Sequence, residues 1–372
     1  MAIKMKRILI FAPTAPATGI TQYILNILNE LKSADANVDI LSFRNDRLKK
    51  WTEENKTQYF EMDISMYKHP FLYRRFLKDV FSRGYDAVHF NMSSISTLTI
   101  FKYAKKFGAK KIIMHSHSSF TDLASQIRRI VFSNLHKFLR IFANKYFDVK
   151  CACSDPAAEW MYGKKAAQSA LILHNAVDTK KFAFNKVYAD EIREKYGVKT
   201  EYLIGHIGRF TVQKNHTFII DIFRELCKIR NDCTLMLVGN GEFLENIKNK
   251  VKELNLTENV VFVDFQEDIF KYYSAMDLFL MPSLFEGLPI TLVEAQANGL
   301  PSLISDAVTR ECDLTGLVEF FPLTESNRRW AERICEKLKI GRKNSMDTEK
   351  QLEQSGFSLS GQAQVISKLY FE

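Results

Sequence analysis

The sequence predicts an α/β protein of two doubly wound domains, each a parallel β-sheet covered by helices on both faces. Short apolar runs rich in β-branched residues alternate with longer segments of helical periodicity, which is the pattern of a parallel sheet with helical crossovers. The alternation occurs twice, on either side of a polar, charged segment at residues 175–200. A length of 372 residues fits two domains that each bury a core of their own.

In the first half, five runs are expected to form strands, and a shorter run at residues 170–173 is a candidate for a sixth. The five expected strands span residues 7–12, 38–42, 87–91, 111–115 and 149–154. Helical spacing of the apolar side chains predicts helices over residues 22–31 and 97–107. The first apolar run ends at Pro13 and lacks a small-residue cleavage site, so we expect a strand there and not a signal peptide.

The second half repeats the alternation with five more strands. They are expected at residues 202–208, 234–239, 260–263, 278–282 and 301–305. Helices are predicted over residues 215–230, 243–254, 269–276 and 290–297. We therefore expect a Rossmann-like domain at residues 1–180 and another at 181–356, facing each other across a cleft. A last helix at about 357–372 is expected to pack back on the first domain.

Composition and charge exclude several classes of protein. No apolar run approaches the ~20 residues of a transmembrane helix. The six cysteines show neither a CxxC pair nor the spacing of metal ligands, and free cysteines are typical of a reducing compartment, so we expect a cytoplasmic protein. Residues 1–180 hold 28 basic and 15 acidic side chains, whereas the rest of the chain holds 24 and 28. Basic character confined to one domain, without a recognisable nucleic-acid-binding module, indicates that the protein does not bind nucleic acid.

A candidate anion site follows the strand that ends at Gly208. There the sequence is GRFTVQKN, with Arg209 and Lys214 five residues apart, before a helix begins. In open parallel sheets, ligands bind beyond the carboxyl ends of the strands. A forked arginine donor, a lysine point charge and the free N–H groups of a helix start together favour a phosphate. The alternative is that both cations are ordinary solvated loop residues.

A second candidate segment, PSLFEGLPITLVEA, follows a later strand. Gly287 would allow a backbone to approach a ligand closely, and Pro289 suits the first position of a helix. The amides of residues 290–292 would then be unsatisfied donors suited to a phosphate. Glu294, eight residues after Glu286, could accept hydrogen bonds from vicinal hydroxyls such as those of a ribose. The alternative is that Glu286 only caps the helix and that Glu294 lies on a solvated helix face.

Together these motifs resemble those of retaining GT-B glycosyltransferases of family 4. The resemblance is carried by the E-x7-E spacing of Glu286 and Glu294 in PSLFEGLPITLVEAQANGLPSLISD, by GHIGRFTVQKN and by LVGNGE. It covers nearly the whole chain and is greatest to bacterial transferases that build capsule or exopolysaccharide. It implies an enzyme that moves a hexose or N-acetylhexosamine from a nucleotide sugar, with UDP favoured, to a saccharide acceptor of the lipid-linked kind.

The resemblance also implies a role for each candidate site residue. Arg209 and Lys214 would bind the donor pyrophosphate and stabilise the departing nucleoside diphosphate. Glu286 would contact hydroxyls of the donor sugar, and His117 in MHSHSSF would lie near that sugar, whereas His115 is expected to point into the sheet or toward the surface between the domains. The donor-binding residues would be Gly19 in the first loop, Gly239 and Gly241 leaving room for the base, Phe265 and Gln266 against the base, Gly287, Leu288, Pro289, Ile290, Thr291 and Leu292 around the sugar and the distal phosphate, and Glu294 on the ribose.

The expected chemistry needs neither a metal ion nor another cofactor. The chain contains no DxD pair, which metal-dependent sugar transferases use to hold a divalent ion on the pyrophosphate. Transfer would proceed on the front face with retention, through an oxocarbenium-like state, while the two cations neutralise the departing charge. The leaving phosphate would deprotonate the acceptor hydroxyl. A double displacement with Glu286 as nucleophile is the other path.

Two positions depart from the family pattern. A single Gly19 stands where many relatives have a glycine pair, and Ala176 follows Asn175 where relatives often have Asn-Gly. Neither change removes a charged contact, so neither excludes the implied activity.

Two stretches of the basic half, at residues 67–85 and 127–147, interleave cations with apolar and aromatic side chains. Lys and Arg opposite Phe and Leu are typical of helices that lie on an anionic membrane surface. The pattern predicts peripheral contact of the N-terminal domain with the inner face of the cell membrane. The alternative is a pair of ordinary helices packed on the sheet.

Two other classes of enzyme use related folds. A dinucleotide oxidoreductase would need G-x-G-x-x-G after the first strand, where this chain has only Gly19. A GT-B sugar synthase or phosphorylase-like enzyme with a soluble acceptor stays open, because these motifs do not describe the acceptor loops.

Overall fold

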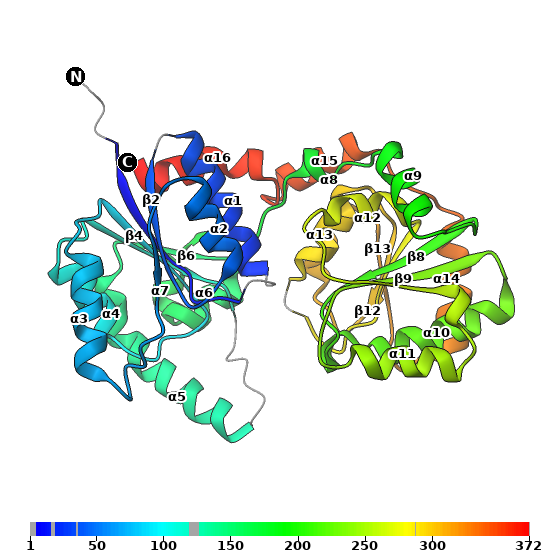
Figure 1. Ribbon diagram of the computed structural model, residues 1–372, viewed down its shortest axis with the longest axis horizontal. Coiled ribbons are helices and arrows are strands. Elements are labelled where there is room, and N and C mark those ends of the chain that lie inside the picture. Colours follow the sequence, from blue (N-terminus) through cyan, green and yellow to red (C-terminus); the bar gives the residue numbers. More distant parts are fainter. Residues whose placement is uncertain (1–4, 16–18, 35, 119–125, 287, 372) are drawn as a thin grey trace. The chain divides into compact units, whose positions relative to one another are not determined.

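The computed structural model describes residues 5–15, 19–34, 36–118, 126–286 and 288–371. The chain divides into two units, residues 1–175 with 362–372 and residues 176–361. In each unit the paired strands are parallel, and helices cover both faces of the sheet (Figure 1). The predicted class, two doubly wound α/β domains, is therefore confirmed.

Within its described residues, the first unit holds a seven-stranded sheet in the order β3-β2-β1-β4-β5-β6-β7. The strands are β1 Arg7–Phe11, β2 Asn37–Ser42, β3 Tyr59–Glu61, β4 Ala87–Met92, β5 Lys111–Ser116, β6 Val149–Ala152 and β7 Leu171–Ile172. The helices are α1 Gly19–Ser33, α2 Asp46–Glu54, α3 Pro70–Phe81, α4 Thr99–Lys106, α5 Gln126–Ala143, α6 Asp155–Tyr162, α7 Lys164–Ala167, the 3-10 turn η1 Asn144–Tyr146, and the end of α16 Leu359–Phe371. The predicted strands and the candidate sixth are present, and the strand that we missed is the edge strand β3.

The described part of the second unit holds a six-stranded sheet in the order β10-β9-β8-β11-β12-β13. The strands are β8 Tyr202–Ile207, β9 Cys233–Val238, β10 Val260–Val263, β11 Leu278–Met281, β12 Ser302–Ser305 and β13 Val318–Phe321. The helices are α8 Thr179–Phe182, α9 Lys186–Lys195, α10 His216–Ile229, α11 Leu244–Glu253, α12 Ile269–Ala275, α13 Ile290–Ala297, α14 Asn327–Leu338 and α15 Ser345–Gln354, with the 3-10 turns η2 Val212–Lys214, η3 Thr257–Asn259 and η4 Arg310–Cys312. The five predicted strands and four predicted helices are confirmed, whereas β13, α9, α14 and α15 were not predicted.

Different helices bury the two faces of each sheet. In the first unit, α1, α2 and the end of α16 cover one face, and α3, α4 and α6 cover the other. In the second unit, α9, α12, α13 and α15 cover one face, and α10, α11 and α14 cover the other. A strand covered on both faces needs apolar side chains throughout, and every side chain of β9 and β11 is buried. This is why these strands appear in the sequence as apolar runs, which are interrupted only by Thr234 in β9.

The last helix returns to the first unit. Ile366, Leu369 and Tyr370 of α16 are buried in the same cluster as β1 and α1. Lys6 Nζ donates to the backbone carbonyls of Tyr370 (3.1 Å) and Phe371 (2.7 Å). These carbonyls belong to the last turn, which leaves acceptors unsatisfied, so the lysine caps the helix and complements its dipole.

In both sheets the order of the strands reverses beside the first strand of the unit. β1 lies between β2 and β4, and β8 lies between β9 and β11. At such a switch point the loops after the two neighbouring strands leave on opposite sides of the sheet, which opens a crevice at the carboxyl edge where ligands bind. In the second unit, the loops after β8 and β11 are the segments that contain Arg209, Lys214 and Glu286.

Candidate functional site

A largely buried ion pair joins the loops after β8 and β11 at the switch point of the second unit. Lys214 Nζ lies 2.7 Å from Glu286 Oε1, and the two side chains are 14% and 9% exposed. Gln213 Nε2 donates to Glu286 Oε2 (3.0 Å) and to the carbonyl of Phe285 (3.0 Å). Leu284 N donates back to the carbonyl of Gln213 (2.8 Å). Two of the predicted catalytic residues are thus in direct contact, although they are far apart in the sequence.

The contacts of Glu286 differ from those of a helix cap. Lys214 and Gln213 hold the carboxylate, and the backbone of Glu286 forms a parallel bridge with Val308. The carboxylate is therefore fixed in one position, and the ammonium group of Lys214 is held beside it. An anionic ligand that entered this crevice would meet an ammonium group that has already lost much of its water.

Arg209 lies outside this pair. Its side chain is 71% exposed, and its guanidinium lies 3.4 Å from a carboxylate oxygen of Glu242, which is itself 55% exposed. Exposed pairs of this kind contribute only about 0–1 kcal/mol. Arg209 can therefore exchange Glu242 for an anionic ligand at little cost.

Gly239 and Gly241 have a structural role that we did not predict. Gly239 has φ +144°, and a Cβ there would lie 2.2 Å from the carbonyl oxygen of Gly208. A Cβ at Gly241 would lie 2.4 Å from the carbonyl oxygen of Phe210, whose N–H donates into the glycine loop (2.9 Å). A side chain at either position would meet the backbone of the loop after β8, and the expectation that the two glycines leave room for a nucleotide base stays a prediction. The glycines therefore shape the loop that carries the exposed arginine.

At the start of α13, two of the three amides that were predicted to be free have no acceptor in the described part of the chain, and the third is bonded. Pro289 is the N-cap and not the first helical residue, and the helix begins at Ile290. Leu292 N donates to the carbonyl of Pro289 (3.0 Å), so its amide is not free and that prediction is wrong. The cause is a first turn tightened to a 3-10-type bond. Among the described residues, the amides of Ile290 and Thr291 have no acceptor.

Glu294 lies one turn inside α13 and is 6% exposed. The alternative that it lies on a solvated helix face is therefore wrong. The hydroxyl of Tyr273 in α12 lies 2.7 Å from Glu294 Oε2 and 3.0 Å from the carbonyl of Thr291. Burial raises the pKa of the Glu294 carboxyl to about 7, against the opposing effects of the Tyr273 hydrogen bond and the charge of Lys181. Near neutral pH this group is therefore divided between its protonated and ionised forms.

The other predicted donor residues lie around the same edge of the sheet. Phe265 is 45% exposed, and Gln266 Nε2 donates to a backbone carbonyl two residues earlier (3.3 Å), both in the loop after β10. β9 separates that strand from β8. Leu288 precedes α13 and is half-buried, and Gly287 lies outside the described residues.

In the first unit, His117 directly follows β5 and Gly19 begins α1. His117 Nε2 lies 2.9 Å from Asn91 Oδ1, an acceptor, so we assign the ring proton to Nε2 and leave Nδ1 as an acceptor. The ring stacks on that of His115 at 4.3 Å between centroids. His115 is fully buried and lies 3.0 Å from the hydroxyl of Tyr23, so the expectation that it points into the sheet is confirmed.

Burial keeps these imidazoles neutral. It lowers the pKa of His117 to about 3, against a weaker opposite effect of Asn175. It also lowers the pKa of His89 to about 3. His117 can therefore accept or donate a hydrogen bond at neutral pH, but it is not a cation there.

Several residues that shape these sites were not predicted. Gln213 holds Glu286, Tyr273 holds Glu294, and Asn91 orients His117. Gln213 could have been suspected from its place beside Lys214 after a strand. Tyr273 and Asn91 carried no such signal, because each lies within an ordinary helix or strand pattern.

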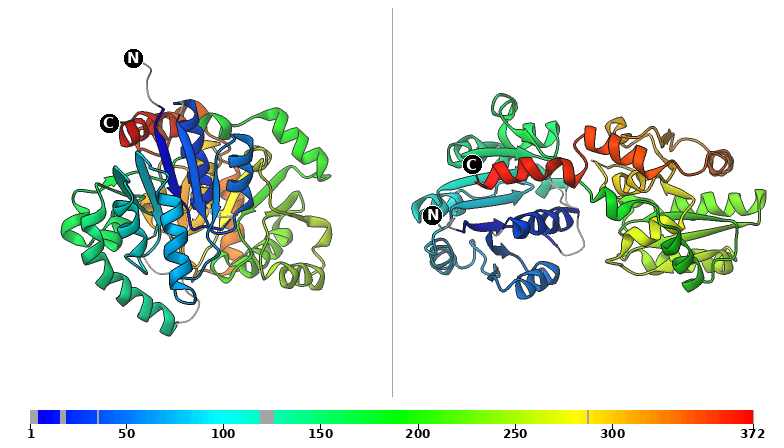
Figure 2. Two further views of the ribbon diagram at one scale, coloured as in Figure 1. Left: turned by 60° about the vertical axis from the view of Figure 1, so that its left-hand side comes forward. Right: turned by 90° about the horizontal axis from the view of Figure 1, so that it is seen from above.

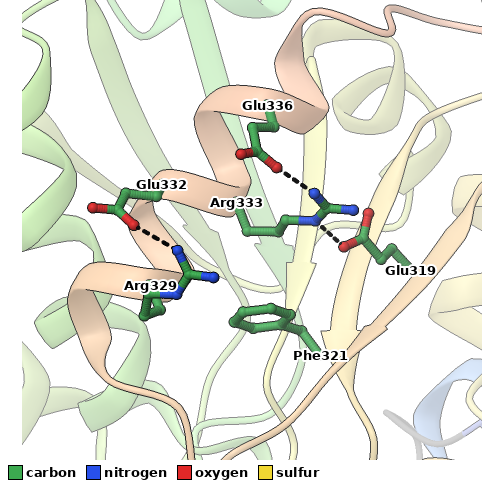
Figure 3. Close-up of a pocket in the computed structure, with 6 residues that line it drawn as sticks. All are labelled: Glu319, Phe321, Arg329, Glu332, Arg333 and Glu336. Carbon is green, nitrogen blue, oxygen red and sulfur yellow. Dashed lines mark hydrogen bonds and ion pairs between the residues drawn. The ribbon is translucent and has the colours of Figure 1, made fainter.

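A cavity of about 280 Å³ lies elsewhere in the second unit, between β13 and α14 (Figure 3). It is lined by Glu319, Phe321, Arg329, Glu332, Arg333 and Glu336. Arg329 pairs with Glu332 at 3.1 Å, and Arg333 pairs with Glu319 and Glu336 (Figure 3). The charges satisfy one another, so this cavity is a surface ion-pair network and not a second candidate site.

Two features are absent from the part of the chain that the structure describes. No group of three His, Cys, Asp or Glu side chains in this part of the chain is placed to hold a metal ion. No helix in the same part is both long enough and apolar enough to cross a bilayer.

Sequence comparison relates the chain to known glycosyltransferases. Residues 189–320 match the family described as Glycosyl transferases group 1. The chain is 28% identical to the putative glycosyltransferase EpsF of Bacillus subtilis (strain 168), over 100% of this chain and 97% of EpsF. It is 25% identical to the UDP-Gal:alpha-D-GlcNAc-diphosphoundecaprenol alpha-1,3-galactosyltransferase of Escherichia coli, over 61% of this chain and 59% of that enzyme.

Solved structures share the fold. HepE of Anabaena, crystallised with UDP and glucose, has a TM-score of 0.73 at 18% identity, with 98% of each chain covered. The lipopolysaccharide glycosyltransferase WaaG has a TM-score of 0.67 at 14% identity, with 96% of this chain and 99% of WaaG covered. These likenesses show that the two parallel-sheet domains form a GT-B fold.

Proposed function

This chain carries a group 1 glycosyltransferase domain and is homologous to EpsF along its whole length, and from that premise we propose its reaction. It transfers a hexose or N-acetylhexosamine from a UDP-sugar to a lipid-linked saccharide, with retention of configuration and without a metal ion. The observation that carries the proposal is the Lys214–Glu286 pair at the switch point of the second unit, with the buried Glu294 one helical turn beyond the start of α13.

Charge neutralisation is the proposed task of the two cations. The pyrophosphate of the donor gains negative charge as the bond to the sugar breaks, so a cation already in place stabilises the transition state more than the ground state. Lys214 is held in position by Glu286, and Arg209 is free to close on the ligand from the surface. The amides of Ile290 and Thr291 supply further donors at the positive end of the α13 dipole.

The carboxylates then hold hydroxyl groups. Glu286, fixed by Lys214 and Gln213, accepts from the donor sugar, and the ionised form of Glu294 accepts from the ribose. His117 is neutral and its Nδ1 is an acceptor, so its role is to orient the sugar and not to act as the base of the reaction. The leaving phosphate takes the proton of the acceptor hydroxyl, and the acceptor oxygen forms its bond on the face from which the phosphate departs.

The donor and acceptor classes are supported by the proteins that this chain resembles. HepE was crystallised with UDP and with UDP-glucose. The names of two relatives describe transfer to sugars on diphosphoundecaprenol or diphospho-undecaprenol, in Escherichia coli and in Campylobacter jejuni. A lipid-linked saccharide is therefore the proposed acceptor.

A soluble acceptor is the second candidate. The chain is 28% identical to the mannosylfructose-phosphate synthase of Agrobacterium fabrum over 39% of this chain, and it shares the fold of a sucrose-phosphate synthase at a TM-score of 0.69. Both names describe synthesis of a phosphorylated disaccharide. Sugar phosphates therefore belong in the same acceptor panel.

The test is a donor and acceptor panel with the purified full chain. UDP-, ADP- and GDP-sugars are offered with polyprenyl-diphosphate saccharides or with sugar phosphates, and NMR of the product gives the anomeric configuration. We expect turnover with a UDP-sugar and a lipid-linked acceptor, an unchanged anomeric configuration and full activity in EDTA. An inverted product, activity that depends on added metal, or exclusive use of sugar phosphates would each overturn the corresponding part of the proposal.

A further inference from the structure

Helix α5 of the first unit exposes an unusual number of large apolar side chains. Six of them lie on this one helix, with exposures between 40% and 67%: Ile130, Val131, Phe132, Phe138, Ile141 and Phe142. By comparison, α3 exposes Phe71 and Leu72 in its first turn and buries Tyr73, Leu77 and Val80. Exposed apolar side chains gathered in one place mark a binding surface, whereas scattered ones do not.

The exposed residues form one stripe. At about 100° of rotation per residue, all of them except Phe132 fall within an arc of ~120°. We call this set, Ile130, Val131, Phe138, Ile141 and Phe142, the apolar stripe of α5. The fully buried residues of the helix, His136 and Ala143, lie on the opposite side. The stripe therefore faces away from the core of its own unit.

Contacts on the inner side fix this rotation of the helix. His136 Nε2 lies 2.9 Å from the carbonyl of Trp160, and its Nδ1 accepts from the amide of Ile95 (2.9 Å). Arg140 donates to the carbonyls of Glu159 (3.0 Å) and Trp160 (2.5 Å). The helix cannot turn its apolar stripe inward without breaking these bonds.

Cations border the stripe, and no acidic residue lies on the helix. Arg128 and Lys137 project beside the stripe on either side and are both exposed, whereas Arg129 is exposed on the opposite side of the helix, near His136. An apolar stripe between Lys and Arg side chains matches the boundary of an anionic bilayer, where lipid tails receive the apolar groups and headgroups pair with the cations. The first turns of α5 stand clear of the other elements of the unit in the views of Figure 1 and Figure 2.

The charges and apolar side chains of α5 distinguish an anionic membrane from two other possible partners, a second copy of the chain and a nucleic acid. A second copy docked through the same helix would bring four basic side chains against four, with no carboxylate on either helix to pair them. A nucleic acid would match the cations but would leave the apolar stripe in water. Of these three occupants, the surface of an anionic membrane is the one that satisfies both halves of the pattern.

We propose that α5 is a membrane-docking element, and that its apolar stripe inserts into the interface of an anionic bilayer while Arg128 and Lys137 contact lipid headgroups. The docking surface lies in the first unit and does not depend on the donor site. Only the purpose of the docking rests on the proposed function: it would hold the enzyme at the membrane that contains a lipid-linked acceptor.

Sedimentation with vesicles tests the proposal on the full chain. We expect binding to phosphatidylglycerol–phosphatidylcholine vesicles at low salt, little binding to pure phosphatidylcholine, and loss of binding in about 1 M NaCl, where charges are screened beyond ~3 Å. Replacing Arg128 and Lys137 by Gln should weaken partitioning about 25-fold, at roughly fivefold for each cation. The variant Phe138→Ser/Ile141→Ser/Phe142→Ser should weaken it at least tenfold.

Matched controls lie in the second unit. Lys199→Gln/Lys252→Gln removes the same charge from exposed positions, and Val187→Ser/Ile340→Ser/Met346→Ser removes exposed apolar side chains. Both should bind vesicles like the wild type. An equal loss in the control and α5 variants, no sedimentation of the wild type, or a dimer in solution that the apolar α5 variant abolishes would each overturn the proposal. Circular dichroism on heating reports that both units of every variant are folded, and failure of the wild type to bind UDP would contradict the proposed function alone.

Discussion

Lys214 and Glu286 neutralise each other at 2.7 Å while both are largely removed from water. Such a pair contributes little net stability, because each partner loses its hydration, but it makes the loss of one partner costly. The two charges are retained at the one edge of the sheet where a doubly wound domain binds ligands. This favours a role in ligand binding over a role in stability.

Replacing Lys214 by Met should therefore have two separable effects. The free energy of unfolding should fall by about 3 kcal/mol, because Glu286 is left buried without a counter-charge. Turnover should fall more than the affinity for the donor, because the cation acts mainly on charge that develops in the transition state. Urea denaturation and steady-state kinetics measure the two effects.

The control for this prediction is a second substitution. Lys214→Met/Glu286→Met removes both charges and should regain most of the stability without regaining activity. Arg209→Gln, at an exposed position, should leave the unfolding free energy within about 0.5 kcal/mol of the wild type while lowering turnover. A double variant as unstable as the single one would show that the buried charge is not the cause.

Glu294 introduces a dependence on pH. Its carboxyl has a pKa of about 7 in the folded protein, and only the ionised form accepts two hydroxyls. The affinity for UDP should therefore rise as the pH is raised through about 7. Tyr273→Phe removes a hydrogen bond that lowers this pKa, so the midpoint should move to higher pH. Calorimetric titration with UDP across the pH range measures both midpoints, and a flat profile for the wild type would refute the assignment.

The Glu294 carboxyl also makes the free energy of unfolding depend on pH. Its folded pKa lies above the unfolded value of about 4.3, so the folded protein binds the proton more tightly. The resulting stabilisation is complete below the unfolded pKa and is lost as the pH rises through about 7, a change of ~4 kcal/mol. Glu294→Gln keeps the shape and removes the titration. Its unfolding free energy should therefore fall less than that of the wild type over this range.

At the scale of elements, the C-terminal helix α16 contacts a buried histidine of the first unit. Its Tyr370 forms a hydrogen bond with His89 Nδ1 inside the first unit, and both side chains are buried. His89 in turn stacks on His115, which stacks on His117. The last helix therefore supports the row of imidazoles that ends at the candidate sugar-binding histidine.

Removing the hydroxyl in Tyr370→Phe should destabilise the first unit and leave the second unchanged. The expected loss is about 1–3 kcal/mol, because a buried imidazole nitrogen is left without a partner. Hydrogen exchange read by mass spectrometry reports the two units separately. Lys368→Gln, an exposed change on the same helix, should leave both at wild-type protection, and equal loosening of both units in Tyr370→Phe would contradict this account.

At the scale of the whole molecule, the parts that the sequence predicted are those decided by local pattern. Central strands buried on both faces are continuous apolar runs, so they were found within a residue or two. The missed strands β3 and β13 are short edge strands, and most of their side chains are only partly buried. Their pattern is too weak to distinguish them from loops.

The features of the candidate site likewise divide into those that local motifs predict and those that depend on packing. The motifs placed Lys214 and Glu286 after neighbouring strands, and the parallel topology alone brings such loops together. The burial of Glu294 by Tyr273 and the contact of Gly239 with Gly208 depend on packing between separate elements. No local pattern contains that information.

Because the second unit has its own sheet and its own core clusters, it should fold as a fragment of residues 176–361. Arg209, Lys214, Glu286 and Glu294 all lie within it, so the fragment should bind UDP with an affinity within about tenfold of the full chain, a difference of ~1.4 kcal/mol at most. It should transfer no sugar, because the acceptor half is missing. Circular dichroism on heating and calorimetric titration measure folding and binding, with Glu294→Gln in the same fragment as the control that should weaken UDP. A folded fragment that does not bind UDP would show that residues of the first unit hold the nucleotide.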